Sequence, residues 1–214
     1  MKPLIITILT LISISFISNA QDSKSQKILD LLSSKMKKEN SFYIEFNASI
    51  KNKSLGTNQS ETGKGWVKAN KFYASFGDNT IISNGLKTWT IVKEEKSVYQ
   101  SDSDEEDEES INPRKLMTVW ESGFKNKYDK EITLNNEATH VIYLYPKDPG
   151  NVDYHTIMLY ISKSKNELKK VTMKTKDGTS MTYSVTKYLS NTKIDDSKFV
   201  FDQKKYPGYN VIRD

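Results

Sequence analysis

The residues with the most obvious chemical potential form an acidic run, "SDSDEEDEES" at residues 101–110, with seven carboxylates in the eight positions from Asp102 to Glu109. A helix–loop–helix calcium site needs carboxylates at alternate positions and a central glycine. Here the acids are nearly contiguous and glycine is absent. General-acid catalysis would need an apolar wall that desolvates one carboxyl group, and this segment supplies none. Contiguous like charges repel and stay hydrated, which favours a solvated loop. Loose attraction of divalent cations and docking to a basic partner surface stay open as alternatives.

Other catalytic groups are scarce. The chain has no cysteine, and it lacks the zinc-protease, phosphate-loop, nucleophile-elbow and dinucleotide motifs. Its two histidines, His140 and His155, lie in strand-like segments. A lone strand histidine is usually a surface or cross-strand polar residue. The sequence therefore predicts no catalytic residue, no metal and no cofactor.

The N-terminal segment "MKPLIITILTLISISFISNA" has the pattern of a secretory signal peptide. Lys2 gives the positive start, an apolar core follows, and Ser18 and Ala20 are the small residues of a cleavage site. A membrane-spanning helix usually needs about 20 apolar residues, so this alternative is less favoured. We expect residues 1–20 to be cleaved, leaving a single exported domain at 21–214. Without cysteine it carries neither a lipid anchor nor disulfides, so its core alone stabilises it.

The charge pattern limits the partners. The formal net charge is +5, and the lysines are scattered rather than clustered. An exported protein with this pattern is not expected to bind nucleic acid. We expect a monomer.

The apolar spacing predicts a mainly β protein. Ile28, Leu32 and Met36 are four apart and predict a helix over 26–38. The segment "SFYIEFNASIK" alternates strictly, as a half-buried strand does. Short joins between the later strand-like runs predict a curved antiparallel meander of about ten strands, an unclosed β-barrel. Those runs lie near 60–68, 71–76, 79–83, 86–93, 97–100, 126–134, 139–145, 153–162, 168–175 and 179–189.

One segment interrupts this pattern. In "INPRKLMTVWESGF", Asn112 is a plausible N-cap, Pro113 suits the first helical position and Gly123 a stop. The apolar residues Leu116, Met117 and Trp120 follow at helical spacing, which predicts a short apolar-faced helix over 113–122.

We interpret the apolar side chains of the strands as facing one way. They either fill an ordinary core or line a hydrophobic groove closed by the two helices, and the alternation alone is compatible with both. These side chains are Phe42, Ile44, Phe46, Trp66, Phe72, Phe76, Ile82, Trp89, Ile91, Val141, Tyr143 and Tyr145.

Several motifs resemble the periplasmic outer-membrane lipoprotein carrier (LolA) family. "GKGWVKANKFYASF" resembles its Gly-x-x-Trp-x-Lys strand pair, and "IISNGLKTWTI" its Ser-Asp/Asn-Gly-x-x-x-Trp hairpin. "INPRKLMTVWESGF" resembles its inserted lid helix, which an acidic run precedes in one branch of the family. The segment after "YLYPKD", through "DDSKFVF", is similar to its C-terminal half. The resemblance runs from about residue 24 to 212.

The resemblance implies an unclosed β-barrel with a helical lid over an apolar cavity, and neither enzymatic activity nor a cofactor. Its partners would be acylated lipoproteins, an inner-membrane ATP-driven releasing complex and an outer-membrane acceptor. It implies a lid of Leu116, Met117 and Trp120. The lipid-binding lining would be Phe42, Ile44, Phe46, Phe72, Phe76, Ile82, Trp89 and Ile91.

One position departs from the family pattern. Family members carry an arginine just after the Trp-x-Lys segment that latches the lid; here Ala69 or, with a shift of one residue, Lys68 takes its place. Neither offers the five-donor fork of arginine, so another group or apolar packing must hold the lid.

The acidic run would then be a flexible segment that leads into the lid helix. Two rival functions are a lipoprotein- or lipid-sensing module on the same fold and a secreted hydrolase, which would need a polar cluster in the cavity.

Overall fold

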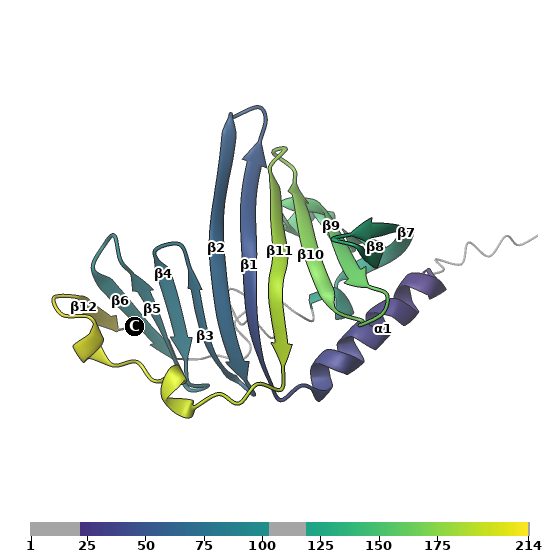
Figure 1. Cartoon of the computed structure of the whole chain (residues 1–214). Helices are drawn as coiled ribbons and strands as arrows, with labels where there is room; N and C mark the ends of the chain where they lie inside the picture. Colours follow the sequence, from purple (N-terminus) through teal and green to yellow (C-terminus); the bar gives the residue numbers. More distant parts are fainter. Residues whose placement is uncertain (1–21, 103–118, 214) are drawn as a thin grey trace, which may run out of the picture.

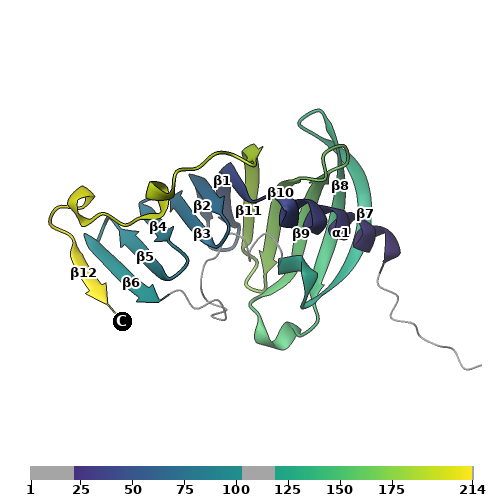
Figure 2. The same ribbon diagram turned by 90° about the horizontal axis from the view of Figure 1, so that it is seen from below.

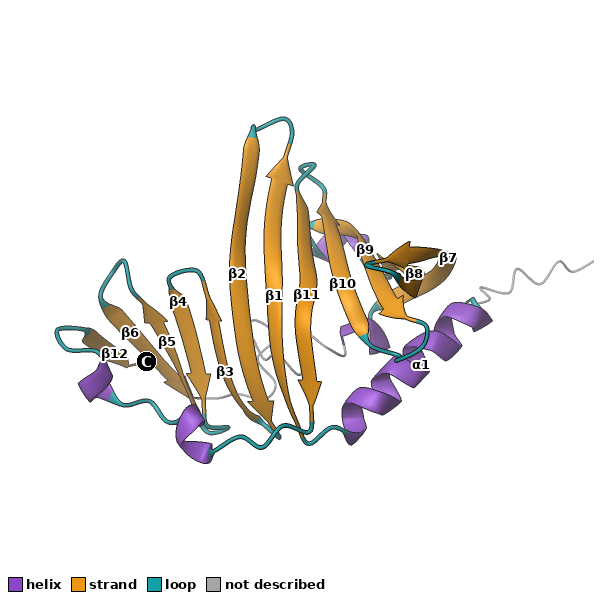
Figure 3. Cartoon of the chain, in the orientation of Figure 1, coloured by secondary structure: helices purple, strands orange, loops and turns teal. Residues whose placement is uncertain are grey.

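A computed structural model describes residues 22–102 and 119–213, and most of these residues form one large sheet (Figures 1 and 3). The helix α1 (Ser23–Lys38) precedes the sheet. Short 3-10 turns are η1 (Val119–Glu121), η2 (Pro149–Asn151), η3 (Asp196–Phe199) and η4 (Gln203–Lys205). The strands are β1 (Ser41–Asn52), β2 (Thr57–Lys68), β3 (Lys71–Phe76), β4 (Asn79–Ser83), β5 (Lys87–Val92), β6 (Ser97–Asp102), β7 (Phe124–Leu134), β8 (Glu137–Pro146), β9 (Tyr154–Ser162), β10 (Leu168–Thr175), β11 (Ser180–Ser190) and β12 (Asn210–Arg213).

The sheet is unclosed and almost entirely antiparallel, as predicted, but its connectivity is not one continuous meander. The strand order is β12-β6-β5-β4-β3-β2-β1-β11-β10-β9-β8-β7. Thus β1 to β6 run outward from the centre, and β7 to β11 run back from the opposite edge to pair with β1. The sheet is thus two antiparallel meanders joined through β1 and β11, a pairing that alternation within each strand does not reveal.

Strand β12 is an addition that the sequence pattern did not predict. It comprises only four residues, too few for a clear alternation, and it pairs in parallel with β6.

The other strands lie within a few residues of their predicted positions. Turn chemistry explains part of this agreement. The two-residue turn between β7 and β8 consists of Asn135 and Asn136, both with positive φ, which suits a tight hairpin.

Helix α1 begins three residues before its predicted start because Asp22 caps it. The Asp22 carboxylate accepts the backbone N–H groups of Lys24 and Ser25, and it also accepts the N–H of Tyr128 in β7, at 2.9 Å. These hydrogen bonds lower the pKa of Asp22. The cap therefore fixes the start of the helix against the edge strand of the sheet.

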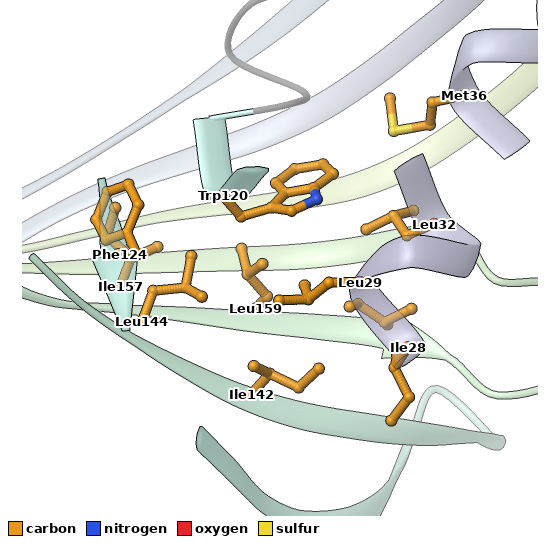
Figure 4. Close-up of a cluster of buried hydrophobic side chains, with 11 residues drawn as sticks. Ile28, Leu29, Leu32, Met36, Trp120, Phe124, Ile142, Leu144, Ile157 and Leu159 are labelled. Carbon is orange, nitrogen blue, oxygen red and sulfur yellow. The ribbon is translucent and has the colours of Figure 1, made fainter. Parts of the chain in front are cut away.

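The buried face of α1 packs against the part of the sheet that β7 to β10 form (Figure 2). Ile28, Leu29, Leu32 and Met36 meet a group of strand side chains. The members of this group are Ile161 and the residues labelled in Figure 4 as Phe124, Ile142, Leu144, Ile157 and Leu159.

A different element covers a second part of the sheet. The segment from Asp195 to Arg213 packs its aromatic residues against β4, β5 and β6. The shared cluster has Ile82, Ile91 and Val98 at its centre. Its partners include Trp89, Phe201, Tyr206 and Tyr209.

The predicted signal peptide at 1–20 lies outside the described residues. Within the described part of the chain, α1 included, none of the helices combines the length and apolar character that crossing a membrane requires.

Candidate functional site

The strand register assigns side chains to the two faces of the sheet, because residues paired across a ladder point to the same side. Ala48 pairs with Tyr183, Tyr183 with Val171, and Val171 with Leu159. Leu159 packs against α1. The set of β1 residues that includes Ala48 therefore shares the face that carries α1, which we call the inner face.

One half of the inner face is filled by the protein itself. Over β7 to β10, α1 and Trp120 of η1 cover the strands, and Trp120 is 4% exposed (Figure 4). The Trp120 indole Nε1 donates to Ser33 Oγ in α1, at 2.9 Å. Trp120 thus packs into the core beside α1, and its lid role stays a prediction. Helical spacing indicated an apolar face for this segment, but not what the face would meet.

The other half of the inner face carries an aromatic shelf, which we define as Phe46, Phe76 and Tyr183. The ring centroids of Phe46 and Phe76 are 6.0 Å apart, and those of Phe46 and Tyr183 are 6.1 Å apart. Phe46 and Phe76 are half-buried, and Tyr183 is 38% exposed. The shelf thus offers apolar surface that the core does not use.

Two glycines in β2 form the floor beneath this shelf. A Cβ on Gly63 would lie 2.2 Å from the Phe46 ring, so the ring lies directly on the glycine backbone. A Cβ on Gly65 would meet the Ile44 side chain at 3.4 Å. The glycines of "GKGWVK" therefore let neighbouring β1 side chains lie flat against the sheet.

A neighbouring apolar cluster borders the shelf. Phe42, Val67 and Phe72 form its buried centre, and Ile44, Ile81 and Tyr188 pack against them. All six come from strands. In the part of the chain that the structure describes, no helical residue belongs to this cluster, in contrast to the half under α1.

The structure divides the eight predicted lining residues between the two faces. Phe42, Ile44, Phe46, Phe72 and Phe76 share the inner face. Ile82, Trp89 and Ile91 lie on the outer face, because Ile82 pairs with both Tyr73 and Trp89 while Ile91 pairs with Thr80 and Val98. Their prediction as cavity lining is therefore wrong: they are core residues beneath the C-terminal segment.

The physical reason is the phase between strands. Alternation shows which residues of one strand lie on the same face. The turn to the next strand decides which residues of that strand lie on this face as well. Four other residues that the alternation placed on the same face as Phe42 and Ile44 are also on the opposite face. Trp66, Val141, Tyr143 and Tyr145 also lie on the outer face.

Sequence analysis also missed inner-face residues. Ile81, rather than its neighbour Ile82, faces the inner side, and β11 contributes Tyr183, Val185 and Tyr188. The alternation within "MTYSVTKYL" gave no clear signal because a register shift interrupts β11 between Val185 and Lys187. A bulge reverses the phase of a strand, so a period of two does not extend across it.

The lid prediction lies mostly outside the described residues, since Leu116 and Met117 are not among them. The two candidates for the missing arginine are described. Lys68 Nζ contacts Asp196 in the C-terminal segment at 2.9 Å and the carbonyl of Ile194, which directly precedes this segment, at 3.1 Å. Ala69 lies in the turn after β2, with a φ of 51°. Lys68 thus binds the C-terminal segment.

The polar groups of the described residues do not converge on a reaction centre. Asp102, the first acid of the run, is exposed and pairs with Lys87 at 3.1 Å; residues 103–109 lie outside the described part. His140 contacts Tyr128, and burial lowers its pKa. His155 contacts Thr156. Within 22–102 and 119–213, no three metal-ligating side chains group together.

A family model described as "Outer membrane lipoprotein carrier protein LolA" matches residues 37–202. No curated protein sequence matches the chain. Among solved structures, an uncharacterized conserved protein of Thermus thermophilus is 13% identical, with a TM-score of 0.56. That match covers 89% of this chain and 99% of the Thermus chain, and it shows a shared fold.

Two further structures are similar at lower scores. A putative outer membrane lipoprotein-sorting protein domain of Vibrio parahaemolyticus has a TM-score of 0.43 at 11% identity. A LolA superfamily protein of Nitrosomonas europaea has a TM-score of 0.42 at 12% identity. Each match covers 82% of this chain and 97% of the other.

Proposed function

Because this chain belongs to the outer membrane lipoprotein carrier (LolA) family, we propose that it is a periplasmic chaperone that carries acylated lipoproteins from the inner to the outer membrane. The family fold is a binding and carrier fold, in agreement with the lack of a catalytic motif. The acyl chains would lie on the inner face, over the aromatic shelf and the bordering cluster of Phe42, Ile44 and Phe72.

The observation that carries the proposal is the contrast within one face. Under α1 the inner face is filled by the protein's own side chains. Over β1 to β4 and β11, the apolar side chains come from strands and several stay half-buried or exposed. A sheet face of this kind normally meets another apolar surface.

The energetics of acyl chains favour such a surface. Each CH₂ removed from water contributes about 0.8 kcal/mol, so several chains left in water would cost tens of kcal/mol. A carrier must also release its cargo. Half-buried aromatic and aliphatic side chains with few polar anchors provide affinity without fixing one geometry for the chain.

Localisation and partners follow from the same proposal. The N-terminal signal pattern supports export, and a Gram-negative periplasm is the compartment in which such cargo needs a carrier. The donor would be an inner-membrane ATP-driven complex, and the recipient an outer-membrane acceptor. A monomer in solution would leave the inner face accessible to both.

Copurification tests the proposal directly. The full chain would be expressed in a Gram-negative periplasm, purified without detergent and analysed by mass spectrometry. We expect acylated lipoprotein to copurify with the wild type. Replacement of the shelf residue, Phe46→Glu, should remove most of it, because a carboxylate on the shelf would have to be desolvated by the acyl chain.

The matched control is Asn47→Glu, one residue along the same strand. Asn47 is exposed and points to the outer face, so the same charge is added to the same strand without touching the shelf. Equal loss of cargo in both variants, or a wild type free of any acylated protein, would contradict the proposal. Circular dichroism would verify that both variants are folded.

The rival function, a lipid-sensing module, predicts a different result in a transfer assay. A carrier should deliver bound lipoprotein to acceptor membranes in proportion to its concentration. A sensor should hold the lipid and change its affinity for a protein partner instead. Transfer of labelled lipoprotein between two vesicle populations separates these functions.

A further inference from the structure

The outer face has a feature that acyl binding does not use. Where β2 meets the C-terminal segment, a surface hollow of about 340 Å³ opens. It lies on the opposite side of the sheet from the shelf, because Trp66 in its wall alternates with Gly65 and Val67 of the inner face. The lining residues are Trp66, Lys193, Ile194, Asp195, Ser197, Lys198 and Lys205.

The charges around this hollow are unbalanced. Three lysines line it against one carboxylate, that of Asp195. Hydrogen bonds from the Ser197 hydroxyl and from the Ser197 backbone N–H, the latter at 2.8 Å, lower the pKa of this carboxyl group. Among the described residues, no carboxylate lies within 4 Å of the ammonium groups of the three lysines, whereas the neighbouring Asp196 pairs with Lys68 and Lys71. The hollow therefore carries a local excess of positive charge.

Lys198 occupies a fixed position in this group. Its Nζ lies 3.8 Å from the ring centroid of Trp66 and 4.2 Å from that of Tyr73. Burial lowers the pKa of Lys198, and the charges of Lys64 and Lys205 lower it further. The protein thus holds a partly desolvated ammonium group near two others of the same sign. That arrangement costs free energy, which a bound anion would offset.

We propose that this hollow, formed by Lys193, Lys198 and Lys205, binds a phosphate group. Lysine is a compact point charge that suits phosphate, and a phosphate dianion can contact several ammonium groups at once. Lys198 is pre-positioned between its two rings, so it loses little side-chain freedom when the anion binds. The phosphate could be free or carried by an anionic phospholipid headgroup, and the experiment distinguishes these sources.

The test has two probes. Inorganic phosphate would be titrated into the full chain by calorimetry at low ionic strength, with chloride matched. Flotation would measure binding to vesicles of phosphatidylglycerol and phosphatidylcholine, with pure phosphatidylcholine vesicles as the reference. Saturable phosphate binding without vesicle binding identifies a free phosphate compound as the ligand. Vesicle binding that requires phosphatidylglycerol and that phosphate competes away identifies the headgroup.

Charge-neutralising variants locate the site. Lys193→Gln with Lys205→Gln should weaken binding roughly tenfold or more, because two charge-assisted contacts are lost. The matched control is Lys53→Gln with Lys147→Gln, which removes the same charge from two other exposed positions. Lys198→Met keeps an apolar stem between the two rings and should also weaken binding. Equal weakening by both double variants, or no saturable binding of either probe, would overturn the proposal.

This result is independent of the proposed carrier function. The Lys193→Gln, Lys205→Gln protein should still copurify with acylated lipoprotein, since the shelf lies on the other face. Loss of phosphate binding with cargo retained supports the hollow as a separate site. Loss of cargo in this variant would contradict that separation.

Discussion

The two halves of the inner face use the same alternation for different purposes. Over β7 to β10, strand side chains such as Leu159 and Ile161 are at most 1% exposed, because α1 and Trp120 cover them. Over β1 to β4 and β11, Phe42, Val67 and Phe72 are also buried, but Phe46 and Phe76 are half-buried and Tyr183 is 38% exposed. One half stabilises the fold, and the other is the half over which we propose that acyl chains lie.

The comparison teaches that apolar content alone does not locate a binding surface. Among the described residues, what separates the halves is that α1 and Trp120 cover one of them, whereas the cluster in the other consists of strand residues. Sheet faces that are apolar and uncovered tend to be interaction sites. Substitutions in the filled half should therefore change stability more than acyl binding, and substitutions in the other half should do the reverse.

The largest expected effect is on the filled half. Leu32→Ala should lower the free energy of unfolding by about 3 kcal/mol, because a buried leucine leaves a cavity. Ile81→Ala removes the same number of carbons from a half-buried position in the other half and should cost only about 1 kcal/mol. Urea denaturation measures both. Affinity for a fluorescent fatty acid should change in the opposite order, falling several-fold only for Ile81→Ala. Identical behaviour of the two variants would remove the distinction between the halves.

A substitution beneath the shelf tests its geometry. Gly63→Ala should destabilise by about 2 kcal/mol and displace Phe46, because the new Cβ would lie 2.2 Å from the ring. Because Phe46 is displaced, the affinity of the Gly63→Ala variant for a fatty acid should fall as well. Adding Phe46→Ala should recover most of the stability, since the clash disappears. A suitable control is Gly150→Ala, whose Cβ would meet only Asp148 at 3.5 Å. Additive costs in the double variant would argue against the contact.

Trp120 tests whether the η1 turn belongs to the core or to a lid. Trp120→Phe should lower the free energy of unfolding by about 1.5 kcal/mol. The reason is that phenylalanine has no N–H to donate to the buried Ser33 Oγ. Fatty-acid affinity per folded molecule should stay unchanged. Combining it with Ser33→Ala should cost less than the sum, as expected for two groups in one hydrogen bond. A large change in affinity with stability intact would instead indicate a gate.

The smallest effect concerns acid stability at the rim of the filled half. Glu137 has a pKa of about 2, mainly because the Ser162 hydroxyl donates to it, with Lys169 and Ser164 also contributing. Because the pKa of Glu137 is lower in the folded protein, its ionised carboxylate stabilises the fold when the pH is above the ordinary pKa of 4.5. This stabilisation disappears as the pH falls through about 2. Glu137→Gln should therefore cost about 1 kcal/mol at pH 7.

The measurement is urea denaturation of both proteins between pH 7 and pH 2. Their unfolding free energies should approach each other as the pH falls, and amide exchange should increase first in the turn joining β9 to β10. A constant difference at every pH would mean that the ionised carboxylate is not the source.

Local features of the sequence predicted much of the fold. The spacing of Ile28, Leu32 and Met36 located α1, and the alternation of "SFYIEFNASIK" located β1. The helix was predicted from residue 26, and the Asp22 cap moves its start to Ser23. Strand β12 was missed since four residues carry too little pattern. The candidate site was predicted only in part: Phe46 and Phe76 share the inner face, but Ile82, Trp89 and Ile91 do not.

The sequence by itself determined most of the strands, the helix α1, and, where no bulge interrupts a strand, which of its residues share a side. These properties depend on neighbours a few residues away. Only the tertiary structure decided that β1 pairs with β11, that α1 covers one half of the inner face, and that the C-terminal segment covers part of the outer face. The reason is that pairing and covering depend on turns, bulges and contacts between residues far apart in the chain, such as Ala48 and Tyr183.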